Sequence, residues 1–205
     1  ADGSRAYAGG INPAGAVRLD RDENLTNLTT GNLNLEYRFL KDFKLAVTYG
    51  FQSTASKNET LANPYYGDAA KIGRIYNTNE NDFSWTLNEI LSWGKTFGDH
   101  TVDAFIAHEA TKNEIDLHDS GKKQLIRGNM TILDDGLIRD GISGYRLTYA
   151  IESYFGQARY DYKNKYYLSS SIRRDGSSRF SPEYRWGTFG SVGAAWIISK
   201  EKFLS

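Results

Sequence analysis

Three acidic side chains, Asp20, Asp22 and Glu23, stand close together near the beginning of the chain. Carboxylate oxygens are the ligands that Ca²⁺ prefers, so this stretch could hold that ion. The spacing does not complete a calcium-binding loop, and a solvated acidic loop is the favoured interpretation. We therefore predict no metal site at these residues.

Two further groups of residues could do chemistry. His100, His108 and His118 lack the close spacing of a zinc site. Asp134 and Asp135 could supply the two carboxylates of glycoside hydrolysis, but adjacent side chains of an extended segment point apart. The sequence contains no nucleophile elbow and no phosphate-binding loop. We therefore predict no enzyme, no catalytic residue and no cofactor.

The composition excludes several classes of protein. The 205 residues include 25 Lys and Arg against 25 Asp and Glu, so no basic excess favours nucleic acid. The absence of cysteine excludes disulfides and thiolate chemistry. Aromatic residues reach 14%, while no run approaches the roughly 20 apolar residues of a membrane helix. The low mean hydropathy does not exclude a membrane barrel, because only alternate residues of its strands are apolar.

Apolar and polar residues alternate in seven segments of the chain, which is the pattern of half-buried strands. The segments are residues 33–39, 43–52, 83–93, 102–109, 154–162, 166–173 and 186–196. Glu89 interrupts one apolar face, which a bulge or a local pair would explain, and Phe105 and Ala107 blur another segment. Prolines fall between the segments, and no amphipathic helix of ten residues is indicated. We predict an all-β fold of antiparallel hairpins.

Short and long connections alternate along the chain. The short ones are Lys41-Asp42, Thr96 to His100 and Lys163-Asn164; the longer ones are about Ser56 to Gly73, Ser120 to Ser143 and Asp175 to Arg185. Such alternation puts the tight turns at one end of the sheet and the long loops at the other, as in outer-membrane barrels. A soluble sandwich or a lipocalin can show the same order by chance.

Two tryptophans provide a test of length. Trp186 and Trp196 share one strand face and are ten residues apart. At about 3.3 Å per residue and a tilt near 45°, they are separated by about 23 Å along the membrane normal, close to the ~25 Å apolar band between aromatic girdles. Packing in a soluble core is the alternative. The predicted lipid-facing girdle consists of Tyr37, Phe43, Trp93, Tyr160, Tyr166, Trp186 and Trp196.

The opposite faces of these segments are polar and are predicted to line a lumen. A wet lumen tolerates mixed charges that a dry core would have to pair. The predicted lumen-lining residues are Glu36, Arg38, Lys44, Gln52, Asn88, Asp103, Glu109, Gln157, Arg159 and Arg173. Since bacterial barrels have an even number of strands, we expect this sheet to continue beyond the chain.

Several motifs of the C-terminal third belong together: Tyr154-Phe155-Gly156, Tyr160-Asp161-Tyr162, the run from Ser171 to Phe180, Arg185 to Phe189, and Ala195-Trp196. With them, Ser153 to Leu204 resembles the late barrel of SusC/RagA-type TonB-dependent outer-membrane transporters. Asn32 to Gly50 and Phe97 to His100 are also similar to that family, so the resemblance spans nearly the whole chain.

The resemblance implies an up-and-down transmembrane barrel of about 22 strands, plugged by an N-terminal domain and energised by TonB. Residues 1–205 would form part of that barrel, without the plug domain and the TonB box. The expected partners are a SusD-like surface lipoprotein, TonB through the missing parts, the rest of the barrel, outer-membrane lipid, and a glycan or peptide substrate. The expected function is import of oligosaccharides or peptides across the bacterial outer membrane. The alternatives are a soluble or surface-attached β-domain that binds carbohydrate, and an outer-membrane hydrolase.

A cationic stretch between the last two segments is expected to form an extracellular hairpin loop, with Gly176-Ser177-Ser178 giving freedom to turn. Its charged residues are Arg173, Arg174, Asp175, Arg179, Glu183 and Arg185. The favoured role is structural, through Arg–carboxylate pairs. Pairing with anionic lipid headgroups, substrate contact and lipoprotein contact are the alternatives.

Overall fold

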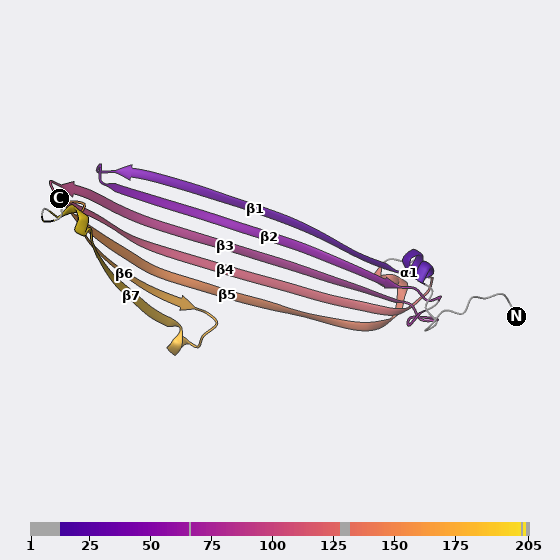
Figure 1. The fold of residues 1–205 in the computed structure, drawn as a ribbon. Coiled ribbons are helices and arrows are strands. Elements are labelled where there is room, and N and C mark those ends of the chain that lie inside the picture. Colours follow the sequence, from indigo (N-terminus) through magenta and orange to yellow (C-terminus); the bar gives the residue numbers. More distant parts are fainter. Residues whose placement is uncertain (1–12, 66, 128–131, 202, 204–205) are drawn as a thin grey trace. The chain divides into compact units, whose positions relative to one another are not determined.

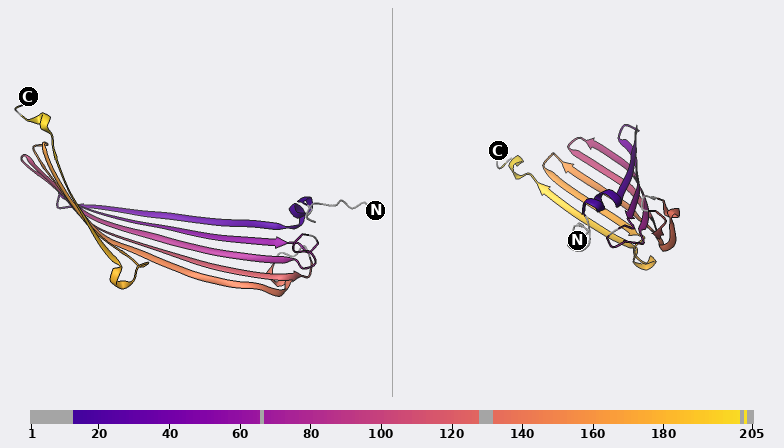
Figure 2. Two further views of the ribbon diagram at one scale, coloured as in Figure 1. Left: turned by 60° about the horizontal axis from the view of Figure 1, so that its bottom comes forward. Right: turned by 90° about the vertical axis from the view of Figure 1, so that its right-hand side faces the viewer.

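The computed structural model describes residues 13–65, 67–127, 132–201 and 203, and its strands follow one another in chain order in a seven-stranded sheet (Figure 1). The strands are β1 (Arg21–Phe39), β2 (Phe43–Ala62), β3 (Arg74–Phe97), β4 (His100–Leu125), β5 (Gly136–Tyr162), β6 (Tyr166–Ser177) and β7 (Trp186–Trp196). The short helices are α1 (Pro13–Leu19), η2 (Leu133–Asp135), η3 (Pro182–Tyr184) and η4 (Ile198–Lys200). The edge strands are β1 and β7 (Figure 2). The predicted all-β, up-and-down fold is confirmed.

The predicted bounds of the long connections were wrong. β2 continues to Ala62 and β4 to Leu125, so these connections are residues 63–73 and 126–135. β6 likewise continues to Ser177, which makes Arg173 and Arg174 strand residues instead of loop residues. Polar side chains occupy both faces of the strand extensions, as where Lys57 pairs with Glu59 on one face of β2 and Thr60 bonds Asn58 on the other, so the alternation that marks a strand is lost there.

The chain divides into two compact units. The described residues of Ala1–Thr29, Ser53–Phe83 and Glu114–Leu147 form unit 1, and those of Thr30–Gln52, Ser84–Asn113 and Thr148–Ser205 form unit 2. No helix among the described residues has the length and apolar character needed to cross a membrane.

Unit 1 contains a small apolar core. Leu61, Ile75 and Leu125 are buried against one another, and Leu133 packs against them. Gly73 has a φ of +64°, and a Cβ there would lie 2.9 Å from the Leu125 side chain, so glycine suits this position on both counts. The connections between strands in this unit are thereby held by packing.

The acidic residues around the beginning of β1 form hydrogen bonds and an ion pair within unit 1. The sequence had favoured a solvated acidic loop without such partners. Asp20 accepts hydrogen bonds from the backbone and side-chain nitrogens of the buried Asn63, at 2.8 and 2.5 Å. Asp22 accepts one from Asn58 at 3.0 Å, and Arg21 pairs with Glu23. These carboxylates therefore hold the end of β2.

Unit 2 contains the tight turns and the last two hairpins. Leu40 and Lys41 have positive φ, as do Lys163 and Asn164, which is the backbone of the two-residue turns that suit twisted strands. In the antiparallel β6–β7 pair, Tyr166 lies opposite Trp196 and Gly176 lies opposite Trp186. β6 and β7 have 12 and 11 residues, close to the roughly 9–11 that a tilted strand needs to cross a bilayer.

Candidate functional site

The candidate site is the two-faced sheet of unit 2. Since side chains alternate along a strand, the β5–β6–β7 register puts Tyr160, Tyr166 and Trp196 on one face, here called the aromatic face. Arg159 and Arg173 lie on the other, here called the polar face. Side-chain contacts extend both faces to β1–β4.

One aromatic cluster lies on the aromatic face beside the β1–β2 turn. The rings of Tyr37 and Phe39 stack at 5.6 Å between centroids, and Phe39 stacks on Phe43 at 5.5 Å. Trp93 follows at 6.5 Å from Phe43, and Phe97 lies 6.5 Å from Trp93. Three residues of the predicted girdle, Tyr37, Phe43 and Trp93, are thus brought together.

A second aromatic cluster lies beside the β5–β6 turn. Tyr162, Tyr166 and Trp196 stack in series, each 6.1 Å from the next. His100 lies 4.7 Å from the Tyr162 ring and hydrogen-bonds the Tyr160 hydroxyl at 2.6 Å. This cluster contains three more residues of the predicted girdle.

Glu201 binds this second cluster from beyond the end of β7. Its carboxylate accepts hydrogen bonds from the Tyr166 hydroxyl at 2.5 Å and from the Trp196 indole at 3.0 Å, and it pairs with Lys165 at 3.0 Å. The hydrogen bonds from Tyr166, Lys165 and Trp196 lower the pKa of Glu201 to about 2. These bonds fix the rings at the tight-turn end of the hairpin.

Trp186, the last residue of the predicted girdle, lies at the other end of β7, where its ring is 6.2 Å from Tyr154. Between Trp186 and Trp196 the aromatic face is open and mainly apolar, with Ser170 as a small polar residue between Leu168 and Ile172. Leu168, Ile172 and Val192 are 50%, 61% and 78% exposed. A contiguous exposed apolar surface of this kind is typical of an interface with another protein or with a membrane.

The polar face contains two ionic groups. In the first, Glu36 accepts from Arg38 at 2.8 Å and lies 3.8 Å from Lys44. Lys44 also lines a cavity of about 330 Å³ together with Asp103, Gln157 and Arg159, among other residues. These predicted lumen-lining residues therefore lie close together in space.

Arg173 is the centre of the second ionic group. Its guanidinium contacts Asp175 at 2.6 Å, the Ser153 hydroxyl at 3.0 Å and Glu109 at 3.4 Å, and it stacks over Phe155 at 4.6 Å. Of the arginines predicted to pair with carboxylates, Arg173 does so, whereas Arg174 and Arg179 lie over the rings of Trp186 and Tyr149. By alternation Gln52 and Asn88 share the polar face, but they belong to neither ionic group.

Phe105 and Phe155 lie on the polar face, where neither was predicted. Phe105 meets Phe155 edge to face, with 6.0 Å between ring centroids. The blurred alternation at Phe105 was the available signal, since an aromatic residue beside Asp103 was out of phase with its segment. The ring of Phe155 supports the Arg173 guanidinium by a cation–π contact.

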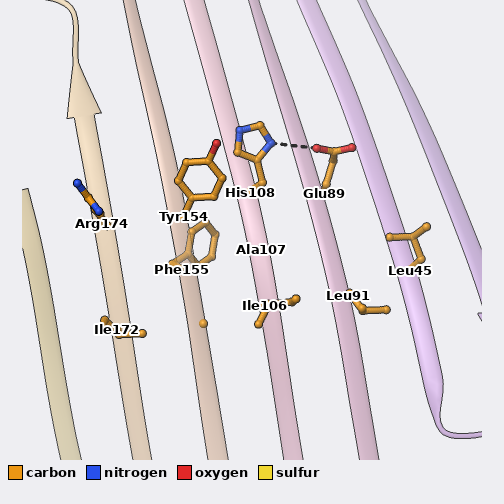
Figure 3. Close-up of a pocket in the computed structure, with 11 residues that line it drawn as sticks. Leu45, Glu89, Leu91, Ile106, Ala107, His108, Tyr154, Phe155, Ile172 and Arg174 are labelled. Carbon is orange, nitrogen blue, oxygen red and sulfur yellow. Dashed lines mark hydrogen bonds and ion pairs between the residues drawn. The ribbon is translucent and has the colours of Figure 1, made fainter. Parts of the chain in front are cut away.

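A polar cluster interrupts the aromatic face and explains how Glu89 can lie on this otherwise apolar surface. The Glu89 carboxylate hydrogen-bonds His108 Nδ1 at 2.9 Å (Figure 3). The other ring nitrogen, His108 Nε2, lies 3.4 Å from Glu152. Tyr154 donates its hydroxyl to Glu152 at 2.6 Å and stacks on the His108 ring at 4.9 Å. A local pair therefore accommodates Glu89 on an apolar face.

The other residues considered for chemistry have structural partners. Asp134 pairs with Lys122 at 3.2 Å, and Asp135 accepts a bond from the backbone nitrogen of Ile132 at 3.2 Å. Within the described part of the chain, no group of three His, Cys, Asp or Glu side chains is arranged to hold a metal ion.

Comparison with known proteins agrees with this geometry. No family model matches the chain. The chain is 28% identical over 94% of its length to the TonB-dependent receptor SusC of Bacteroides thetaiotaomicron, and 27% identical over 94% to a TonB-dependent receptor of Formosa agariphila. It covers 19% and 20% of these relatives, and so spans about a fifth of their length.

Among solved structures, the RagAB peptide transporter superposes with a TM-score of 0.84 at 22% identity, over 94% of this chain and 22% of the matched chain. The open-open state of the RagAB peptide importer gives 0.85 at 20% identity, over the same shares. The predicted resemblance to SusC/RagA-type TonB-dependent receptors is confirmed, as is the match of the seven strands to part of such a fold.

Proposed function

We propose that this chain forms part of the transmembrane barrel of a TonB-dependent transporter that imports a nutrient across the bacterial outer membrane. Its domain would be a partial barrel, without the plug domain and the TonB box. The observation that supports this most strongly is the two-faced sheet of unit 2, with an open apolar band between aromatic clusters on one face and ionic groups on the other. The similarity to TonB-dependent receptors over 94% of the chain supports it independently.

In this proposal the aromatic face contacts lipid and the polar face lines the lumen. Aromatic rings at both ends of the band suit the two membrane–water interfaces, where such rings concentrate. The ion pairs of Glu36 and Arg173 suit a wet lumen, because a charge on the lipid face at mid-depth costs about 2–4 kcal/mol. The Glu89–His108–Glu152 cluster lies near Trp186, at the level of one interface, where this cost is smaller.

Only part of each long strand would lie in the membrane. β5 has 27 residues, whereas a tilted strand crosses the bilayer with about 9–11. We place the crossing in the residues of unit 2, since the apolar band lies there. The unit 1 residues of β2–β5, with polar side chains on both faces, would lie in water.

Cargo and partners form the finer part of the proposal. The similar proteins include one named SusC and one described as a peptide transporter, RagAB. We propose a surface lipoprotein of the SusD type as partner, an oligosaccharide or peptide as cargo, and coupling to TonB through parts of the protein outside this chain. No residue of this chain is proposed as catalytic.

Cysteine labelling tests the face assignment, because the chain contains no native cysteine. Val192→Cys and Leu168→Cys place a thiol on the aromatic face, and Ser191→Cys and Ser169→Cys place the matched thiol one residue away on the polar face. In outer-membrane vesicles of the full-length protein, a charged maleimide should label the Ser positions and spare the other two. A lipid-soluble maleimide should show the reverse preference.

Equal labelling of Val192→Cys and Ser191→Cys by the charged reagent would count against a membrane barrel. It would favour the second candidate, a soluble or surface-attached carbohydrate-binding β-domain, in which both faces are reached by water or protein.

A further inference from the structure

A groove of about 530 Å³ opens in unit 2 on the aromatic face (Figure 3). One part of its lining is aliphatic and the other is polar, and the polar residues are those nearer to Trp186. The aliphatic residues are Leu45, Leu91, Ile106 and Ile172, and the polar ones are Glu89, His108, Tyr154 and Arg174. The groove is therefore amphipathic along its length.

Two glycines, Gly156 and Gly190, create the hollow because they have no side chains to fill it. Gly156 lies opposite Ile172, and Ile172 lies opposite Gly190 on β7. A Cβ at Gly156 would lie 3.6 Å from Ile106, so any longer side chain there would fill the space beside Ile106. Ile106 and Ile172 are left 66% and 61% exposed, as the two walls of an apolar trough.

The polar part of the groove contains a positive charge, that of Arg174, with no ion-pair partner among the described residues. Arg174 lies with its guanidinium 5.2 Å from the centre of the Trp186 ring, and it forms no ion pair with any residue in the described ranges. Its neighbour Arg173 differs, since on the opposite face it is paired with Glu109 and Asp175. Arg173 therefore has carboxylate partners within the chain, whereas Arg174 has none in the part of it that the structure describes.

The carboxylates near Arg174 are already occupied. Glu89 bonds His108, and Glu152 accepts the Tyr154 hydroxyl and approaches His108. The Arg174 guanidinium is therefore the charged group at this end of the groove whose N–H donors are not bound to a carboxylate. A guanidinium offers a fork of N–H donors that matches phosphate oxygens, and stacking on Trp186 orients that fork.

We propose that this groove binds a phosphorylated, acylated lipid of the outer leaflet, with its phosphate at Arg174 and one acyl chain in the trough between Ile106 and Ile172. The proposal rests on the proposed function, because lipid reaches the groove only if the aromatic face lies in the membrane. The order of the groove matches that of a lipid: its charge lies beside the interfacial Trp186, and its aliphatic part extends toward the membrane interior.

Lipid binding can be measured on the full-length protein that contains this chain, reconstituted in phosphatidylcholine nanodiscs. Lipid A is the probe, its occupancy is read by native mass spectrometry, and EDTA is present so that no divalent cation bridges phosphate to Glu89. Arg174→Gln should weaken lipid A binding about fivefold or more, as expected for loss of one basic residue at a membrane surface. Arg185→Gln, a matched loss of charge in the loop that follows, should bind as the wild type does.

Two further measurements separate phosphate from acyl chain. Dephosphorylated lipid A should bind wild type and Arg174→Gln alike. Ile172→Trp, which fills the trough, should weaken binding of both forms of lipid A. Arg174→Lys keeps the charge but loses the guanidinium fork and its stacking on Trp186, so it should recover only part of the affinity for lipid A. That partial loss, absent for dephosphorylated lipid A, tests the site if Arg174→Gln fails to assemble.

Equal affinity of wild type and Arg174→Gln for lipid A would overturn the lipid site, as would a phosphate-independent effect of Arg174→Gln. Val192→Cys labelling on the same preparations distinguishes the two proposals. Protection of that thiol with no Arg174 effect removes the lipid site alone, whereas labelling by the charged maleimide removes the membrane barrel and the lipid site together.

Discussion

Units 1 and 2 use their polar and apolar residues in opposite ways, although β1–β5 contribute residues to both. Of the buried hydrophobic residues among the described ones, Leu61, Ala69, Ile75 and Leu125 belong to unit 1 and Ala107 alone to unit 2. Unit 1 has a small core of its own. Unit 2 sorts its side chains by face and leaves the apolar ones exposed, as a sheet that faces lipid would.

Polar pairing differs between the units as well. In unit 1, Thr78 donates to Asp119 at 2.6 Å and Arg146 pairs with Asp116 at 2.5 Å, as in a sheet wetted on both sides. Asp140 binds Lys123 and Tyr76, and the hydrogen bonds from these two groups hold the pKa of Asp140 below its usual value. In unit 2, the ion pairs of Glu36 and Arg173 lie on the polar face, and the others lie near the tight turns or in the Glu89–His108–Glu152 cluster. The difference shows that alternation of apolar and polar residues indicates that the two faces of a strand have different surroundings. A strand with water on both faces need not show it.

The largest effect is expected from the unit 1 core. Ile75 is 1% exposed, so Ile75→Ala should lower the free energy of unfolding by about 2–5 kcal/mol through lost burial and a new cavity. Ile138→Ala, at a position in the same unit that is 47% exposed, should cost about 0.5 kcal/mol or less. Urea unfolding of the full-length protein in lipid vesicles measures both, and equal losses would mean that unit 1 has no core of its own.

The next largest effect is expected when an arginine is introduced into each unit. Val192 in unit 2 and Ile142 in unit 1 are both strand residues, 78% and 67% exposed. If the aromatic face lies in lipid, Val192→Arg should destabilise the assembled protein by about 2–4 kcal/mol. Ile142→Arg, in water, should change stability by about 0.5 kcal/mol or less. Assembly yield and the urea midpoint in vesicles measure the effect, and similar values for the two variants would break the distinction between the units.

The same contrast explains what could be predicted from the sequence. The seven predicted segments lie within the observed strands because unit 2 separates apolar from polar residues by face. The strand extensions of unit 1 were missed because pairs such as Thr78 with Asp119 use polar residues on strands. The partners of Glu89 and Arg173 could not be identified in advance. His108 and Glu109 lie on another strand, and only the register between strands brings them near.

Arg173→Ala should have a smaller effect than either change above. The loss should be about 1–2 kcal/mol, since Ser153 is fully buried and loses a charged donor, while Glu109 and Asp175 are about one-third exposed and remain partly solvated. Arg173→Lys should recover only part of this, because an ammonium cannot reproduce the fork or the stacking on Phe155. Arg185→Ala is the matched control. Urea midpoints that do not distinguish Arg173→Ala from that control would show that the network adds no stability to the polar face.

The smallest effect concerns pH at the tight-turn end of unit 2. Hydrogen bonds from Tyr166, Lys165 and Trp196 lower the pKa of Glu201 from 4.5 to about 2. A carboxyl whose pKa is lower in the folded state stabilises the fold above its unfolded pKa. This contribution should therefore be complete at neutral pH and should disappear as the pH falls from about 4.5 to about 2. Glu201→Gln should be less stable than wild type at neutral pH, and the difference in urea midpoint should close within that window. A difference that stays constant down to the lower limit would show that the Glu201 charge does not hold the aromatic cluster, and that packing among Tyr162, Tyr166 and Trp196 suffices.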